Sequence, residues 1–183
     1  MRIATIVDDT EAEGPGRRWA VWVQGCSIRC AGCCNPEMFD ARRGRDVLVG
    51  ELVAAIPDRV EGISVLGGEP FDQAGDVAAL ARGAKLRGKT VMVFSGYTLA
   101  ELQARDVVLD DVDLLVDGRF DQSRPEPPPP RGRRWIGSTN QVMHWLSDAY
   151  REDDPAMRAS NILEIRYSAR GLVINGWPTR VTR

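Results

Sequence analysis

The sequence lacks several features that would place it in common classes of protein. No run of about 18 apolar residues occurs in the 183-residue chain, which argues against a membrane-spanning helix. The amino terminus lacks a basic segment followed by a long apolar stretch, so we expect no signal peptide and a cytoplasmic location. The formal net charge is only −2, so we expect no general nucleic-acid-binding surface and no nucleic-acid partner.

Cysteine is absent from almost the whole chain. All four cysteines fall between residues 26 and 34, which excludes a disulfide framework and favours a metal site. Thiols stay reduced in the cytosol, where an iron–sulfur cluster can be assembled. Lysine is scarce as well, which we attribute to the base composition of the source genome. Hydrophobic residues make up 43% of the chain, which is enough for the core of one ordinary globular domain.

The cysteines Cys26, Cys30 and Cys33 form a C-x3-C-x2-C pattern on one short segment. Three thiolates at this spacing can hold three corners of a cubic [4Fe–4S] cluster and leave the fourth iron without a protein ligand. Structural zinc sites and electron-transfer clusters usually take four protein ligands. A set of three therefore favours a cluster that binds a substrate directly. Two alternatives stay open, namely Cys34 as the third ligand and a zinc site completed by Cys34 or His144.

Apolar periodicity predicts alternating strands and helices through the centre of the chain. We expect strands over residues 2–7, 19–24, 62–66, 90–94 and 112–116 and helices over residues 46–56, 76–86 and 98–105. This alternation is typical of βαβ units with a parallel sheet, and so of an α/β fold. A complete (β/α)8 barrel usually needs about 250 residues, so we expect a partial, laterally open barrel of about five or six mainly parallel strands.

The chain is predicted to divide into residues 1–145, which form the partial barrel, and residues 146–183, an extension packed on it. Within the extension, residues 161–168 and 171–175 are typical of a carboxyl-terminal β-hairpin. In the core, the proline run from Pro125 to Pro130 and the basic residues after it exclude a helix or a central strand. We expect a stiff, exposed loop there.

Five glycine-containing motifs accompany the cysteine segment, most of them directly after predicted strands. They are Gly14-Pro15-Gly16-Arg17, Gly67-Gly68-Glu69-Pro70, Ser95-Gly96-Tyr97, Val116-Asp117-Gly118-Arg119-Phe120 and Gly137-Ser138-Thr139-Asn140-Gln141. In sheets of this kind, ligands bind near the carboxyl ends of the strands. These motifs are therefore candidates for the walls of a binding site.

Together with the cysteine spacing, these motifs resemble those of the activating proteins of anaerobic ribonucleotide reductase, a family of the radical S-adenosylmethionine (SAM) superfamily. The resemblance keeps the same order from about Gly14 to about His144. The resemblance implies that Cys26, Cys30 and Cys33 hold a [4Fe–4S] cluster whose open iron chelates the amino and carboxylate groups of SAM. It also implies that the reduced cluster passes one electron to SAM, which yields methionine and a 5′-deoxyadenosyl radical. That radical takes a hydrogen atom from a glycine of a partner protein.

The resemblance also implies which residues surround the cofactor, and no catalytic residue beyond the cluster and SAM. SAM contacts are expected from Gly32, Cys34, Gly67, Gly68, Glu69 and Ser95. Further contacts to SAM or to the partner are assigned to Arg17, Asn35, Tyr97, Asp117, Asn140 and Gln141. The family carries an aromatic residue at the position of Cys34, so stacking on the adenine is lost here. A side chain introduced at Gly68 is expected to project into the cofactor site.

The implied partners are a glycyl-radical enzyme, with anaerobic ribonucleotide reductase as the leading candidate, and a one-electron donor such as flavodoxin or ferredoxin. The open side of a partial barrel would admit a loop of such a large protein. Two other interpretations stay open. One is a radical SAM enzyme that acts on another peptide or on a small molecule, and the other is a non-enzymatic iron–sulfur or zinc-binding module.

Overall fold

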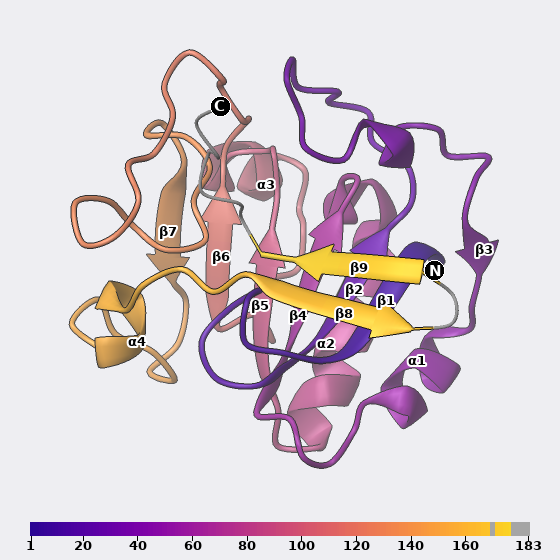
Figure 1. The fold of residues 1–183 in the computed structure, drawn as a ribbon. Helices are drawn as coiled ribbons and strands as arrows, with labels where there is room; N and C mark the ends of the chain where they lie inside the picture. Colours follow the sequence, from indigo (N-terminus) through magenta and orange to yellow (C-terminus); the bar gives the residue numbers. More distant parts are fainter. Residues whose placement is uncertain (169–170, 177–183) are drawn as a thin grey trace.

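The computed structural model describes residues 1–168 and 171–176, and in this part of the chain a seven-stranded mixed sheet forms the centre (Figure 1). The strand order is β3-β1-β2-β4-β5-β6-β7. The strands are β1 (Arg2–Thr10), β2 (Arg18–Val23), β3 (Arg45–Asp46), β4 (Gly62–Gly67), β5 (Thr90–Phe94), β6 (Leu114–Asp117) and β7 (Val142–Trp145). Strands β2, β4, β5 and β6 run parallel, whereas β1, β3 and β7 pair antiparallel beside them. The loops that follow the parallel strands therefore meet at one edge of the sheet.

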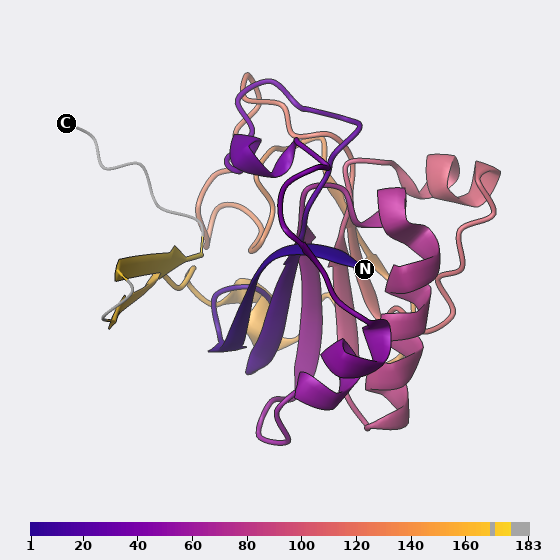
Figure 2. The ribbon, with the colours of Figure 1, turned by 90° about the vertical axis from the view of Figure 1, so that its right-hand side faces the viewer.

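Helices cover one face of the sheet (Figure 2). They are α1 (Val49–Ala55), α2 (Ala74–Leu86) and α3 (Leu99–Ala104), with the short 3-10 turns η1 (Pro36–Met38) and η2 (Pro70–Gln73) and the single-turn helix α4 (Pro155–Arg158) elsewhere. Helix α2 buries Val77, Leu80 and Ala84, whose spacing of three and four residues puts them on one side. Thr98 begins α3 with a capping box, a pattern that the spacing of Thr98 and Glu101 in the sequence indicates. Its hydroxyl accepts from the Glu101 N–H, and the Glu101 carboxylate accepts from the Thr98 N–H.

Strand β2 is buried along its whole length, because both faces of the sheet are covered. Trp19 and Val21 belong to the apolar cluster under the helices. Ala20 and Trp22 belong to a smaller cluster on the opposite face, together with Leu66. A continuous apolar run of this kind is typical of a parallel strand that is covered on both sides. The strand ends at Val23 and leads directly into the cysteine segment.

A separate β-hairpin lies on the face of the sheet that the helices leave free (Figure 2). Strands β8 (Glu164–Ser168) and β9 (Gly171–Asn175) pair antiparallel, which confirms the predicted hairpin. Residues 169–170 and 177–183 of the predicted extension lie outside the described residues. Within the described residues, no helix combines the length and the apolar character that crossing a membrane requires.

The predicted strands and helices are present, with shifted ends and two additions. Asp46, expected to open the first helix, instead ends β3, the edge strand beside β1, and α1 begins at Val49. Strand β7 was not predicted, and its pairing with β6 places His144 beside Leu115. The described sheet therefore has seven strands rather than five or six. The proline segment forms turns with a single bridge between Pro125 and Ser138, in agreement with the predicted loop.

Candidate iron–sulfur and cofactor site

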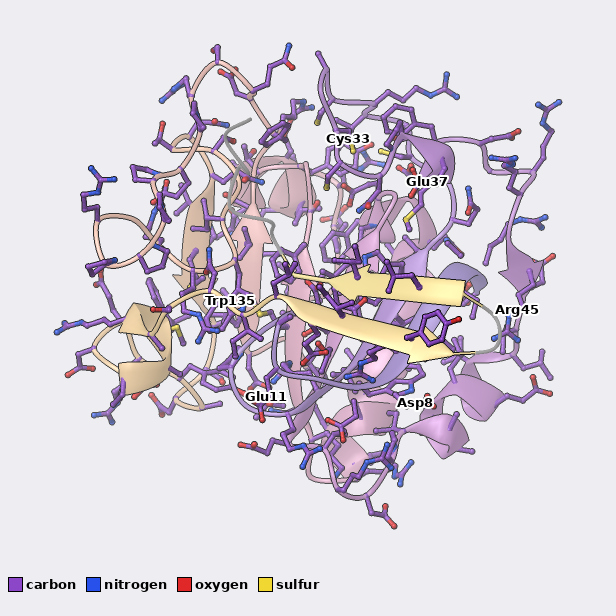
Figure 3. All side chains as sticks on the ribbon, in the orientation of Figure 1. Asp8, Glu11, Cys33, Glu37, Arg45 and Trp135 are labelled. Atoms are coloured by element: carbon purple, nitrogen blue, oxygen red, sulfur yellow. The ribbon has the colours of Figure 1, made fainter. Side chains whose placement is uncertain are left out.

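Loops from the carboxyl ends of the parallel strands line a cavity of about 570 Å³. It lies against the face of the sheet that the helices leave free, and Figure 3 shows Cys33 and Glu37 on the segment above the strands. The predicted site residues that line the cavity are Cys26, Cys30, Cys33, Cys34, Asn35, Gly67, Gly68, Glu69, Ser95 and Gln141. The fold thus brings together residues from four separate loops.

Backbone hydrogen bonds hold the cysteine segment against the end of β4. The N–H of Gly68 donates to the Val23 carbonyl at 2.9 Å, and the N–H of Glu69 donates to the Gly25 carbonyl at 2.8 Å. A Cβ atom at Gly68 would collide with the carbonyl oxygen of Gly25. The expectation that a side chain here projects into the cofactor site is therefore wrong, because the two backbones approach too closely for any residue other than glycine.

The sulfur atoms of the three predicted ligands each accept a backbone hydrogen bond. The N–H of Arg29 lies 3.5 Å from Cys26 Sγ, and the N–H of Asn35 lies 3.4 Å from Cys33 Sγ. The Cys30 thiol accepts from the backbone of Phe120. Hydrogen bonds to sulfur are one of the means by which proteins tune iron–sulfur clusters. Three half-buried thiols with such donors, all on one cavity, therefore fit a cluster.

Burial and mutual contact set the protonation of the free thiols. Burial raises the pKa of Cys26 and of Cys30. A hydrogen bond from the Cys34 thiol lowers the pKa of Cys33 to about 6, and the same contact raises the pKa of Cys34. The thiolate is the form that binds metal, and the contact between Cys33 and Cys34 favours that form on one of these two adjacent thiols.

No three His, Cys, Asp or Glu side chains among the described residues are grouped so that they could hold one metal ion. A closed zinc site needs its ligands to converge on a single ion. In a cubic cluster each thiolate binds a different iron, so the sulfur atoms need not converge on one point.

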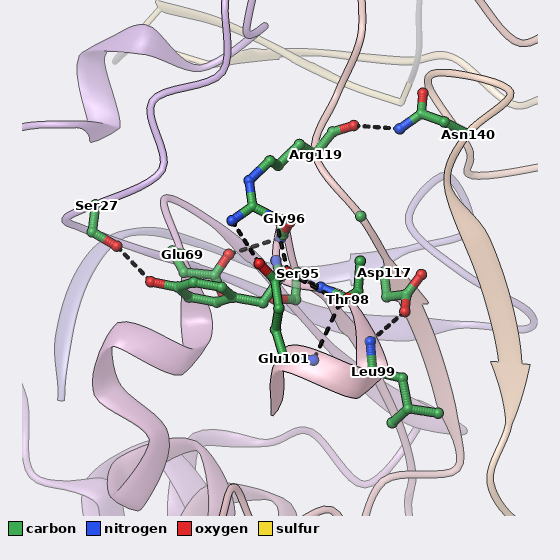
Figure 4. A network of polar contacts seen from close by, with 12 residues as sticks. Ser27, Glu69, Ser95, Gly96, Thr98, Leu99, Glu101, Asp117, Arg119 and Asn140 are labelled. Carbon is green, nitrogen blue, oxygen red and sulfur yellow. Dashed lines mark hydrogen bonds and ion pairs between the residues drawn. The ribbon is translucent and has the colours of Figure 1, made fainter. Parts of the chain in front are cut away.

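Glu69 connects the loop after β4 to the loop after β5 (Figure 4). Its carboxylate accepts from the Phe71 N–H at 3.0 Å, from Ser95 Oγ at 2.8 Å and from the Gly96 N–H at 2.8 Å. The side chain is 1% exposed, and burial raises its pKa to about 7. Glu69 thus positions two loops of the cavity, and its predicted contact with SAM remains a prediction.

Asp72 fixes the residue that follows the first cysteine. Its carboxylate accepts from the N–H and from the hydroxyl of Ser27, both at 2.7 Å, and Ser27 Oγ lies 2.8 Å from the Tyr97 hydroxyl. Arg105 covers the Tyr97 ring at 4.2 Å from its centroid. Tyr97 therefore holds the cysteine segment from outside the cavity. The sequence reasoning missed Asp72, whose only signal is its place three residues after Glu69.

Arg17 does not belong to this site. It precedes β2, whereas the cysteine segment follows β2, so the two lie at opposite ends of that strand. Its guanidinium donates to Asp9 at 3.0 and 2.6 Å. The expectation that Arg17 contacts SAM is therefore wrong, and a contact of Arg17 with the partner stays a prediction.

Other predicted contacts close loops beside the cavity. Asp117 accepts from the N–H of Leu99 at 2.5 Å and lies 2.9 Å from His144 Nε2, which gives the single histidine of the chain a structural contact. Asn140 donates to the Arg119 carbonyl at 2.8 Å (Figure 4). Asp117 and Asn140 are absent from the cavity wall, as is Gly32.

Gly32 faces away from the cavity toward a neighbouring loop. Its φ of +73° lies in the left-handed region, and an added Cβ would collide with the side chain of Gln122. Gln141 does reach the cavity wall, while its amide also donates to the Gly118 carbonyl at 3.0 Å. Of Asp117, Asn140 and Gln141, only Gln141 is placed where it could contact a ligand.

The sequence reasoning also missed the apolar wall of the cavity and two polar residues in it. The wall includes Val7, Trp22 and Leu66 on the face of the sheet away from the helices. Glu13, which accepts from the Gly176 N–H at 2.8 Å and whose pKa is raised by burial, and the buried Asn175 add polar groups. Only the alternation of side chains along each strand points to this wall, and it does not say which face holds a ligand.

A cysteine triad above the carboxyl ends of a parallel sheet, with hydrogen bonds to each sulfur, defines a protein with a single iron–sulfur cluster site. A family model for a 4Fe-4S single cluster domain matches residues 12–144. The predicted cluster is thereby confirmed at the level of the domain, and the assignment of individual ligands stays a prediction.

Several curated proteins are similar to this chain over most of its length. The protein of Vibrio cholerae is 33% identical over 142 residues, which cover 72% of this chain and 89% of the relative. The Salmonella typhimurium protein is 35% identical over 144 residues, and the Escherichia coli K12 protein 34% over 145 residues, each covering 73% of this chain and 91% of the relative. All three are named anaerobic ribonucleoside-triphosphate reductase-activating protein. This chain belongs to that family, as the sequence motifs predicted.

Proposed function

We propose that this chain is a radical SAM enzyme that generates a glycyl radical on an anaerobic ribonucleoside-triphosphate reductase. The observation that carries the proposal is the meeting of the cysteine segment, the Gly67-Gly68-Glu69 turn and Ser95 on one cavity. The names of the relatives support the identity of the partner. The activity then follows from the chemistry of the cofactors that this cavity would hold.

Each part of the cavity has its own task in this proposal. Cys26, Cys30 and Cys33 hold the cluster, and the backbone at Gly68 with the Ser95 hydroxyl orients the amino-acid end of SAM. When bound, the two cofactors supply the electron and the 5′-deoxyadenosyl radical that takes a hydrogen atom from the glycine of the partner. The apolar wall of Val7, Trp22 and Leu66 limits the access of water to that radical.

The open sheet supports a macromolecular substrate. Its strand order ends at β3 on one side and β7 on the other, which is consistent with a partial barrel that stays open laterally. We place the barrel core in residues 1–145 and treat residues 146–183 as an extension packed on it. A one-electron donor such as flavodoxin or ferredoxin reduces the cluster in this proposal.

Electron paramagnetic resonance on the partner tests the proposal. The reconstituted enzyme, SAM, a chemical reductant and the reductase encoded in the same genome are mixed without oxygen. We expect a glycyl doublet on the reductase that disappears in the Cys26→Ala variant. Efficient cleavage of SAM without that doublet would contradict the proposal and would favour a radical SAM enzyme with another substrate. Zinc in place of iron after reconstitution would favour the non-enzymatic interpretation.

A further inference from the structure

The hairpin of β8 and β9 carries its apolar side chains on the outside. The register pairs Ile165 with Ile174 and Tyr167 with Leu172, so these four residues share one face. They are 63%, 54%, 88% and 58% exposed, in that order. We call these four residues the hairpin patch. Exposed apolar side chains are normally scattered singly over a protein surface, so a group of four on one face marks a site of interaction.

The opposite face of the hairpin carries Glu164 and Arg166, which bind the connection between β1 and β2. Glu164 accepts from the N–H of Glu11 at 2.8 Å, and Arg166 donates to the carbonyl of Asp9. The Gly176 N–H, directly after β9, donates to Glu13 at 2.8 Å. These three hydrogen bonds attach the hairpin to the segment between β1 and β2. These contacts hold the apolar face outward, although an isolated two-stranded hairpin is only marginally stable in water.

The patch is continuous with the proposed reaction site. Ile174 belongs to the patch and also lines the cavity, together with Asn175 and Gly176. The same cavity is lined by Cys26 and Glu69. An apolar surface thus runs from the outside of the hairpin to the wall of the cavity.

We propose that the hairpin patch docks the reductase whose glycine enters the cavity, an inference that rests on the proposed function. A second copy of this chain seated on the patch would stand beside the cavity and obstruct the substrate. The polypeptide that delivers the glycine is the partner that must approach this place. The hairpin also lies outside residues 12–144, the part that matches the family model.

Two variants with three substitutions each separate an effect on docking from an effect on SAM cleavage. The patch variant carries Ile165→Ser, Tyr167→Ser and Leu172→Ser, and leaves Ile174 in the cavity wall untouched. The control carries Leu48→Ser, Leu86→Ser and Val108→Ser, which are 71%, 82% and 56% exposed and do not line the cavity. Iron content, thermal midpoint, SAM cleavage with a chemical reductant, the dissociation constant for the purified reductase and the rate of radical formation are measured for each.

We expect the patch variant to keep its iron and its thermal midpoint and to cleave SAM within about twofold of the wild-type rate. Its dissociation constant for the reductase should rise at least about tenfold, with a matching fall in glycyl-radical formation at limiting reductase. The control should match the wild-type protein in every measurement. SAM cleavage measured without the reductase distinguishes a failure of docking from a failure of the active site.

Three results would overturn the inference. Equal affinity and radical yield in the patch variant and the wild-type protein would remove the hairpin from the interface and leave the proposed function intact. A wild-type dimer that becomes monomeric in the patch variant would assign the patch to a second copy of the chain. A lower thermal midpoint without any loss of affinity would assign it to a contact within the chain. If the wild-type enzyme makes no radical on the reductase, the proposed function itself fails.

Discussion

At the scale of single residues, the site shows how one side chain can serve both the fold and the cofactor. Glu69 is the acid of the predicted SAM-binding turn, yet three donors from two loops already occupy its carboxylate. Burial outweighs these donors and raises its pKa to about 7 from 4.5. A change at Glu69 therefore alters loop position and charge together, and the two effects need separate measurements.

The raised pKa of Glu69 predicts a loss of stability as the pH rises. The native state binds the proton more tightly than the unfolded state, so the contribution of Glu69 to the free energy of unfolding falls between pH 4.5 and about 7. A shift of this size corresponds to a loss of about 3 kcal/mol across that window. Denaturant unfolding of the cluster-free protein at several pH values should show this decline, and Glu69→Gln should remove most of it. An identical pH dependence in the variant would contradict the assignment.

The cysteines allow a sharp test of the ligand set. Alanine at Cys26, Cys30 or Cys33 should abolish the cluster and SAM cleavage, because each thiolate binds its own iron. Cys34→Ala should keep about four irons per chain after anaerobic reconstitution, as expected for a cubic [4Fe–4S] cluster. Iron analysis and the absorption spectrum of each variant check this. Loss of the cluster in Cys34→Ala with retention in Cys33→Ala would instead make Cys34 the third ligand.

Gly68 is expected to be needed for the fold rather than to leave space for the cofactor. Gly68→Ala puts a Cβ atom against the Gly25 carbonyl, so the cysteine segment must move away from β4. We expect a loss of at least about 2 kcal/mol in the free energy of unfolding and reduced iron loading. Gly75→Ala in α2 is the control, since no atom lies within 4 Å of its added Cβ and alanine favours a helix. Normal stability and iron loading in Gly68→Ala would refute this reading.

At the scale of elements, the sequence predicts strands with continuous apolar runs better than strands defined by their neighbours. Strands β4 and β5 follow from their apolar runs, and α3 follows from its capping box. Strand β3 is two residues long and exposed, and β7 joins the sheet through its pairing with β6, so neither carries a local signal. The turns of the site were predictable for the same reason as β4 and β5, because they directly follow such runs.

Contacts between side chains from distant elements stayed hidden from the sequence. The bond from Ser27 to Asp72 spans 45 residues, and the pairing of Arg17 with Asp9 depends on the bend between β1 and β2. Neither contact leaves a periodic pattern. The cavity wall could not be predicted either, because the position of the hairpin over the sheet decides which face of β2 lines the cavity.

The hydrogen bonds between Asp72 in η2 and Ser27 in the cysteine segment are expected to affect the cluster more than the fold. Asp72→Ala removes both hydrogen bonds to Ser27, which follows Cys26 directly. We expect the free energy of unfolding to fall by only about 1 kcal/mol, while the electron paramagnetic resonance spectrum of the reduced cluster changes. Asp58→Ala, at an exposed carboxylate paired with Arg87, is the control. An unchanged spectrum and normal oxygen sensitivity in Asp72→Ala would show that Ser27 needs no such support.

At the scale of the whole molecule, the described residues divide into a packed sheet with helices and a hairpin that is attached by few contacts. The apolar clusters draw their members from Met1 through Met157 and include none from the hairpin. The hairpin contributes instead to the cavity, through Ile174, Asn175 and Gly176. Among the described residues, the apolar clusters and the hairpin wall of the cavity therefore belong to different parts of the chain.

This division predicts the outcome of ending the chain after residue 160. The shortened protein loses the hairpin bonds to Glu11, Asp9 and Glu13 but keeps the three apolar clusters found among the described residues, so it should fold and unfold cooperatively. It should still bind its cluster, because all three predicted ligands remain. The cluster should be destroyed by oxygen several times faster, since the cavity has lost one wall. Absorbance at the cluster band after exposure to air measures this rate, with the full chain as reference. An unfolded product would place part of the core beyond residue 160, and an unchanged rate of decay would mean that the hairpin does not enclose the site.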